Sequence, residues 1–128
     1  MHISGVSLLP MSWRVVVHDE FLGELASLMP EIRREVLAHA KLLETFGPTL
    51  GRPRVDTLAG SRFANMKELR FDAGGNVWRV AFAFDPERSA VLLVGGSKSG
   101  VSRKRFYGRL IETADRRYSD HLRAIGKE

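Results

Sequence analysis

The amino-acid sequence predicts a small α+β domain, a mainly antiparallel sheet with helices packed on one face. Three observations lead to this class. Short runs of β-branched and aromatic residues alternate with polar ones, other stretches repeat apolar residues at spacings of three and four, and glycine-rich turns separate the later runs. The expected element order is strand, helix, helix, three strands and helix (β-α-α-β-β-β-α).

The composition indicates one domain with its own core, because the chain has 128 residues and 44% hydrophobic content. We expect this domain over residues 12–128, after an N-terminal extension of residues 1–11 whose weak pattern does not predict order. The lack of cysteine excludes disulfides, thiolate zinc sites and cysteine nucleophiles. No segment approaches the roughly 18 apolar residues of a membrane span, so we expect a cytoplasmic protein without a membrane partner.

The first half of the chain is predicted to form one strand and two helices. Residues 13–17 are typical of a strand, and Asp19 is expected to cap the short helix that follows. Pro30 suits the first turn of a second helix, which Gly47-Pro48 ends. Residues 48–65 lack periodicity and are predicted as an irregular loop. The apolar residues at helical spacing are Phe21, Leu22, Leu25 and Met29 in the first helix and Ile32, Val36, Ala40 and Leu43 in the second.

Two strands after this loop each carry charges on one face. Alternation over residues 67–71 places Glu68 and Arg70 on the face opposite Leu69 and Phe71. Over residues 77–84 it separates Arg79, with Val77, Ala81 and Ala83, from Trp78, Val80, Phe82 and Phe84. A hairpin across Gly74-Gly75 would bring Arg79 close to Glu68 and Arg70. We expect this charged face to be open and the apolar face to be covered by the two early helices.

The end of the chain combines a third strand, a glycine-rich loop and a basic helix. Residues 90–94 are predicted as the strand, and residues 95–100 as a loop that holds Lys98. The helix is expected to start near Ser102. Its apolar stripe is Tyr107, Ile111, Ala114, Tyr118, Leu122 and Ile125.

The net charge of +5 is concentrated in this last segment. Residues 1–96 hold 11 Lys/Arg and 11 Asp/Glu, whereas residues 97–128 hold 9 and 4. Such a surface attracts phosphate backbones or an acidic protein, although a solvated arginine-rich helix would show the same composition.

These motifs together resemble the HigB branch of the RelE/ParE superfamily of bacterial toxins, which includes phage-derived homologues. The resemblance covers residues 13–122 by element order and implies the small RelE-like fold. It rests on Lys67-Glu68-Leu69-Arg70, Trp78-Arg79-Val80-Ala81-Phe82 and Leu92-Leu93-Val94-Gly95-Gly96-Ser97-Lys98.

The resemblance implies the toxin of a type II toxin–antitoxin system, an endoribonuclease (mRNA interferase) that cleaves messenger RNA on the ribosome. Its expected partners are mRNA, the ribosome and an antitoxin, a small helix-turn-helix protein encoded beside it. Members of the family cleave without a metal or another cofactor, by attack of the ribose 2′-hydroxyl on the adjacent phosphate. This chemistry needs help with the hydroxyl proton, cations for the phosphorane charge and a proton donor for the leaving 5′-oxygen.

The resemblance also implies roles for single residues. Arg79 is expected to stabilise the transition-state phosphate, and Arg70 to bind the same or an adjacent phosphate. Lys98 would protonate the leaving oxygen or hold the backbone, and Tyr107 would stack on a base or assist proton transfer. Glu68 is either the general base or the partner that holds both arginines, and the second role is favoured because neighbouring cations weaken a carboxylate as a base. The expected RNA-binding residues are Lys67, Arg103, Lys104, Arg105 and Arg109.

Other interpretations stay open at this point. Arg70 and Arg79 would also suit the solvated face of a sheet, and the loop around Lys98 lacks the spacing of a nucleotide triphosphate-binding loop. No spacing of His, Asp and Glu indicates a metal site, and His121 would serve catalysis only if it folded back. A gyrase-type toxin on the same scaffold would need no catalytic set. A non-catalytic phage-derived module would use its basic helix only to bind an acidic partner.

Overall fold

The computed structural model describes residues 12–128, so the extension predicted for residues 1–11 lies outside them. Three helices are present in the described chain: α1 (Asp19–Ala26), α2 (Pro30–Phe46) and α3 (Arg103–Ala124). The strands are β1 (Arg14–Val17), β2 (Val55–Thr57), β3 (Met66–Ala73), β4 (Asn76–Phe84) and β5 (Ser89–Ser97), and a short 3-10 helix, η1 (Gly47–Thr49), follows α2. No helix of residues 12–128 is long and apolar enough to cross a membrane.

The strands form one sheet in the order β1-β5-β4-β3-β2. All neighbours are antiparallel except β1, which is parallel to β5. The α+β class and the mainly antiparallel sheet are therefore confirmed. The prediction of an irregular loop over residues 48–65 was wrong in part, because β2 lies in it and pairs with β3, with Asp56 opposite Glu68. Three residues are too few to reveal an alternating pattern.

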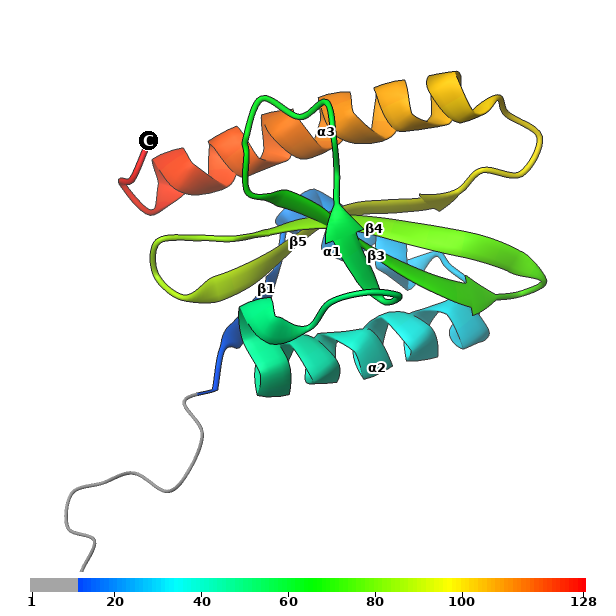
Figure 1. Ribbon diagram of the computed structural model, residues 1–128, viewed down its shortest axis with the longest axis horizontal. Helices are drawn as coiled ribbons and strands as arrows, with labels where there is room; N and C mark the ends of the chain where they lie inside the picture. The colour runs from blue at the N-terminus through cyan, green and yellow to red at the C-terminus, as the bar shows by residue number, and fades with distance from the viewer. Residues whose placement is uncertain (1–11) are drawn as a thin grey trace, which may run out of the picture.

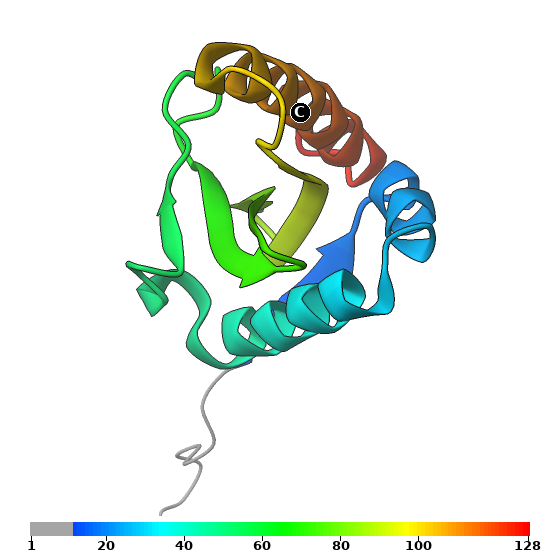
Figure 2. The same ribbon diagram turned by 90° about the vertical axis from the view of Figure 1, so that its right-hand side faces the viewer.

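Helices cover both faces of the sheet, and not one face as predicted (Figures 1 and 2). On the first face, called the α2 face, α1 and α2 pack on apolar side chains that include Leu69 and Phe82. On the second, called the α3 face, α3 packs on Ala81, Ala83 and Val91. The small residues that were expected to leave this face open instead let the helix approach the sheet closely.

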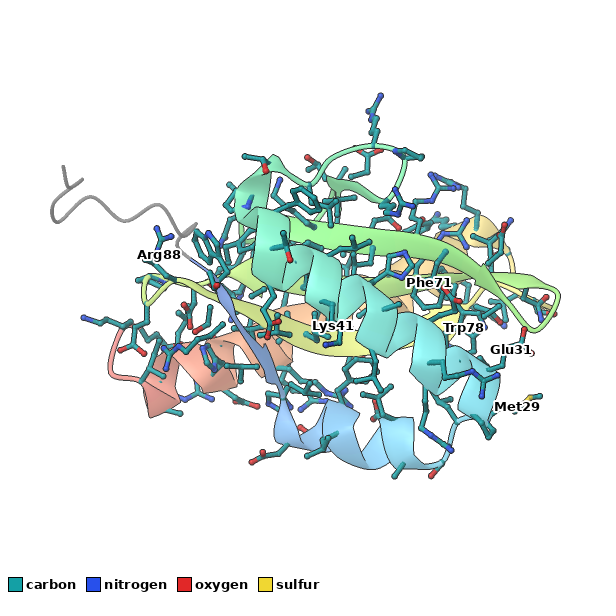
Figure 3. All side chains as sticks on the ribbon, turned by 90° about the horizontal axis from the view of Figure 1, so that it is seen from below. Met29, Glu31, Lys41, Phe71, Trp78 and Arg88 are labelled. Atoms are coloured by element: carbon teal, nitrogen blue, oxygen red, sulfur yellow. The ribbon has the colours of Figure 1, made fainter. Side chains whose placement is uncertain are left out.

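The predicted faces of β3 and β4 are confirmed. Phe71 and Trp78 are cross-strand partners and lie on the α2 face, which Figure 3 shows with both residues labelled. Gly74 and Gly75 form the hairpin turn with φ of 60° and 79°, values that glycine adopts without strain. The Gly74 N–H also donates to Glu31 Oε1 of α2 at 2.9 Å. This end of the hairpin is thus held against α2.

The helix starts follow the prediction in one case and depart from it in another. Ser102 is the N-cap of α3, and its side chain accepts a hydrogen bond from the Arg105 N–H. At α1 the N-cap is His18, whose Nδ1 accepts the Glu20 N–H at 3.2 Å, so the prediction of Asp19 as the cap was wrong by one residue. A ring nitrogen here replaces the usual oxygen acceptor, and Asp19 lies in the first turn, where a negative charge is favourable.

The C-terminal half of α3 is fixed by two buried polar contacts. Arg117 donates to Glu24 Oε1 of α1 at 2.9 Å and to the Leu93 carbonyl at 2.8 Å. His121 Nε2 lies 2.7 Å from Asp85 Oδ2 in the turn between β4 and β5. These contacts set the direction of the helix, so that its N-terminal turns lie over the other end of β3, β4 and β5.

Candidate functional site

Beneath the N-terminal turns of α3 the structure brings together Glu68, Arg70 and Arg79. Arg70 and Arg79 are direct cross-strand partners, an arrangement that is unfavourable for two like charges. Glu68 Oε1 lies 3.9 Å from Arg79 Nε, and the two side chains are only 9% and 6% exposed. Glu68 therefore compensates the buried charge of Arg79. The expected proximity of these residues is confirmed, but Arg79 does not lie on an open face.

Aromatic rings of α3 cover Arg79. Its Cζ lies 5.7 Å from the ring centroids of both Phe106 and Tyr107, a distance at which a cation is attracted to a ring face. Arg103 Cζ lies 4.9 Å from the Tyr107 centroid. Arg79 Nε is buried without a hydrogen-bond partner among the described residues, and Nη1 makes a 3.4 Å bond to the Val77 carbonyl. The guanidinium is thus held in place, and its Nε–H has no hydrogen-bond acceptor among the described residues.

Tyr107 links α3 to Glu68. Its hydroxyl donates to Glu68 Oε1 at 2.9 Å. Burial raises the pKa of Tyr107 above its usual 10.0, and the Glu68 carboxylate raises it further. The phenol therefore stays protonated at neutral pH and acts as a donor. This arrangement suits a positioning role for Tyr107 better than a role as a base.

A β-bulge determines on which face Gly96 lies. Ala81 pairs with Val94 but Phe82 pairs with Leu92, so Leu93 is an extra residue in β5. An extra residue reverses the alternation beyond it. Gly96 consequently lies opposite Arg79 on the α3 face, where an added Cβ would lie 3.4 Å from Phe106. Lys98, two residues further and just beyond the end of β5, lines a cavity together with Arg79.

Gly95 and Gly96 do not form the loop that the sequence predicted, because β5 continues to Ser97. Their missing side chains let the helices approach the sheet. A Cβ on Gly95 would lie 3.2 Å from Val80 and 3.3 Å from Phe21, which is closer than ordinary packing. The glycine pair thus reflects close packing of β5 on both faces.

Two cavities flank this group. The Arg70 cavity, of about 590 Å³, is lined by Asp56, Thr57, Leu58, Ala59, Glu68, Arg70, Arg103, Lys104 and Tyr107. The Lys98 cavity, of about 380 Å³, is lined by Asn76, Val77, Arg79, Lys98, Ser99, Gly100 and Val101. The five residues predicted as catalytic are therefore divided: Arg79 and Lys98 line one cavity, and the other three line the other.

The predicted RNA-binding residues are more widely spread. Arg103 and Lys104 line the Arg70 cavity. Arg105 is exposed but lines neither cavity, and Arg109 borders a separate hollow beside Gly96. Lys67 alternates with Glu68 on β3, so its side chain shares the α2 face with Leu69. The structure does not bring Lys67, Arg105 or Arg109 to the two cavities.

The sequence prediction missed Asp56 in the Arg70 cavity. A hydrogen bond from the Thr57 N–H, with help from the nearby Arg52 and Arg70 charges, holds the pKa of Asp56 below its usual 3.8. The side chain is thus an anion at neutral pH. Only the pairing of β2 with β3, which the sequence did not reveal, places it beside Arg70.

No histidine of residues 12–128 lines either of the two cavities. His121 is bonded to Asp85, and its separation of 14 positions from Tyr107 along α3 corresponds to roughly 20 Å. Among the described residues, His18, Glu20 and Asp120 offer ligand atoms within 4.8 Å of one another, a group that the sequence did not reveal. Arg116 Nη1 lies 3.2 Å from Glu20 and 4.0 Å from Asp120, so an arginine already occupies this cluster.

One family model and two relatives are similar to this chain in sequence. Residues 23–119 match the model of the phage-derived protein Gp49-like family. Two relatives come from Mycobacterium tuberculosis H37Rv, both named as toxins: HigB3 is 54% identical over 81 residues, which are 63% of this chain and 68% of HigB3. HigB2 is 40% identical over 123 residues, which are 94% of this chain but only 60% of the length of HigB2.

Solved structures show the same fold at low sequence identity. A mutant of the Escherichia coli toxin RelE in the free state superposes with a TM-score of 0.58 at 13% identity, over 84% of this chain and 98% of that protein. A chain of the archaeal RelE–RelB complex from Pyrococcus horikoshii gives a TM-score of 0.50 at 22% identity, over 71% of this chain and the whole of the other. The predicted RelE-like fold is confirmed.

Proposed function

The chain belongs to the Gp49-like family, within the HigB-like branch of the RelE/ParE superfamily, and from this premise we propose that it is the toxin of a type II toxin–antitoxin system that cleaves messenger RNA. The observation that carries the proposal is the buried Arg79, paired with Glu68 and open to a cavity with Lys98. A guanidinium held in this way is a preorganised partner for the charge of a phosphorane.

The reaction that suits this site is attack of a ribose 2′-hydroxyl on the adjacent phosphate. The 2′-oxygen loses its proton and bonds to phosphorus, while the bond from phosphorus to the 5′-oxygen breaks. The products are a 2′,3′-cyclic phosphate and a 5′-hydroxyl, which takes up a proton. The chemistry needs cations and proton transfer, both of which side chains supply.

In this proposal Arg79 binds the scissile phosphate in the Lys98 cavity, and its charge stabilises the transition state. Lys98 lies in the same cavity and donates the proton to the leaving oxygen. Glu68 and Tyr107 are positioning residues, since both of their functional groups are bonded to each other beside Arg79. The proton acceptor for the 2′-hydroxyl is left to the RNA, the ribosome or solvent.

The proposed partners follow from the same family. An antitoxin would hold the toxin inactive by binding it, and the archaeal RelE–RelB complex is a case in which a protein of the same fold is bound by a partner. We propose a small helix-turn-helix protein encoded beside this chain. The substrate would be mRNA on the ribosome, which places the activity in the cytoplasm.

The test is tightly repressed induction of the wild type and Arg79→Ala, with mapping of mRNA 5′ ends in the same cultures. We expect growth arrest and new 5′ ends with the wild type only, and a loss of at least about 100-fold in cut frequency for the variant. Arg123→Ala is the matched control, because Arg123 is an exposed arginine of α3 outside both cavities. The Arg123→Ala variant should produce new mRNA 5′ ends at the same frequency as the wild type.

Each contrary result has its own meaning. Retained cutting by soluble Arg79→Ala would remove Arg79 from the site. Arrest of the wild type without cuts would indicate a gyrase-type toxin. No arrest at all would indicate a non-catalytic module.

A further inference from the structure

The Arg70 cavity contains a side chain that the proposed cleavage does not use. Arg70, Arg103 and Lys104 suit a phosphate, yet the Asp56 carboxylate lines the same cavity. Its side chain is only 33% exposed, and Oδ1 accepts the Thr57 N–H at 2.8 Å and Arg52 at 3.4 Å. Within residues 12–128, Oδ2 accepts no hydrogen bond. One oxygen is therefore fixed and the other is available to a ligand.

An ionised carboxylate repels a phosphate, so its partner in an RNA ligand must be a donor. RNA offers the amino and imino groups of the base edges and the ribose hydroxyls. The cavity of about 590 Å³ is within the usual range for a small-molecule site. Its lining combines three cations, Arg70, Arg103 and Lys104, with the carboxylates of Asp56 and Glu68, and Glu68 is already bonded to Tyr107. Such a combination matches a whole nucleotide better than a lone phosphate.

The position of the cavity relates it to the cleavage site. Arg70 lies directly across from Arg79 on the neighbouring strand, and neighbouring strands are about 5 Å apart. The two arginines nevertheless line different cavities: Arg70 lines one together with Tyr107, and Arg79, whose Cζ lies 5.7 Å from the Tyr107 ring centroid, lines the other. One phosphate in the Lys98 cavity would therefore not occupy the Arg70 cavity.

We propose that the Arg70 cavity binds the nucleotide next to the scissile phosphate, with Arg70 on its phosphate and Asp56 on a donor of its base. Asp56 is then a residue that determines the sequence preference of cleavage. The inference rests on the proposed function, because it requires an RNA strand with its scissile phosphate at Arg79.

The test is the base composition around mapped mRNA cuts for the wild type and Asp56→Asn. The amide oxygen can still accept the Thr57 N–H, so the fold is kept while the anionic acceptor is lost. We expect a base preference at one nucleotide beside the cut in the wild type. In Asp56→Asn this preference should fall about fivefold or more, since a base contact discriminates by roughly 1–3 kcal/mol. Asp56→Glu keeps the charge and should retain part of the preference.

Arg70→Gln is the matched comparison within the cavity. A phosphate contact carries no sequence information, so this variant should reduce cutting evenly and leave the base preference unchanged. An unchanged preference in soluble Asp56→Asn would overturn the proposal, as would an even loss at all sites, which would indicate a ribose contact. A wild type that cuts no mRNA would reject the proposed function as well, and this distinguishes the two failures.

Discussion

The two faces of the sheet are built by the same strands and differ in what they bury. On the α2 face, α2 packs on an apolar surface, and even His39 stacks on Phe71 with ring centroids 4.9 Å apart. On the α3 face, the same β3 and β4 supply Glu68, Arg70 and Arg79. Alternation thus lets one hairpin provide a core on one side and a charged site on the other.

Apolar packing and charged side chains occupy different parts of the sheet. On the α3 face, the β4 side chains toward the C-terminal half of α3 are the small apolar Ala81 and Ala83, whereas the strand charges Glu68, Arg70 and Arg79 lie toward the hairpin end. Buried arginine costs free energy unless it is paired, and Glu68 is the partner that Arg79 has. In the proposed function, these charged side chains bind RNA phosphates.

The largest expected effect is on the α2 face. Phe82 is fully buried, so Phe82→Ala should lower the free energy of unfolding by about 3–5 kcal/mol. Trp78→Ala should cost less, since Trp78 is only partly buried. Urea denaturation of the purified proteins gives both values. An equal loss of unfolding free energy in the two variants would mean that the degree of burial on this face does not determine the contribution of a side chain to stability.

The second prediction distinguishes a positioning role of Glu68 on the α3 face from a role as general base. In Glu68→Gln the amide oxygen can still accept from Tyr107, but the charge beside Arg79 is lost. As a positioning residue, Glu68 should lose about tenfold in cleavage rate, equivalent to about 1.4 kcal/mol. The pH dependence of the rate, measured in a translation extract, should keep its shape. Loss of the acidic limb of that profile would instead identify Glu68 as the general base.

A smaller effect is expected at the hydroxyl of Tyr107. Tyr107→Phe removes one hydrogen bond to Glu68 and keeps the ring over Arg79, so the free energy of unfolding should fall by only about 1 kcal/mol. A fall of several kcal/mol would mean that the contact holds α3 on the sheet.

Titration of the Tyr107 phenol tests whether the Glu68 carboxylate raises its pKa. The chain has two tyrosines and the pKa of each is raised, so Tyr107 is followed by ultraviolet absorption in a Tyr118→Phe background. Because the folded state raises the pKa of Tyr107, its contribution to stability is full below pH about 10 and is lost as the pH rises through the folded pKa. Glu68→Gln should lower that pKa. An unchanged midpoint would show that the carboxylate does not act on the phenol.

The sequence was sufficient for features that depend on local periodicity. Alternation gave the faces of Glu68 and Arg79, and the Gly74-Gly75 pair indicated the hairpin. Helical spacing gave the buried Ala114, Tyr118 and Leu122 of α3. It was wrong in the N-terminal half, where Phe106 and Leu110 are buried and the predicted Tyr107 and Ile111 are only partly buried. These signals are repeated over several residues and do not depend on the rest of the chain.

Features set by pairing between distant segments were not predictable. β2 is too short to show a pattern, so Asp56 was missed. The small residues Ala81 and Ala83 gave no sign that α3 would cover them. The bulge at Leu93 reverses the alternation of β5 and brings Gly96 to the α3 face, and it is visible only in the register with β4.

A pair of lysine variants tests whether the charged end of the α3 face carries the proposed cleavage. The measurement is the frequency of new mRNA 5′ ends per amount of soluble protein in cultures that express Lys98→Ala or Lys41→Ala. Lys41 is an exposed lysine of α2 and is labelled in Figure 3. We expect a loss of at least about 100-fold for Lys98→Ala and none for Lys41→Ala. Equal cutting by the two variants would contradict the account.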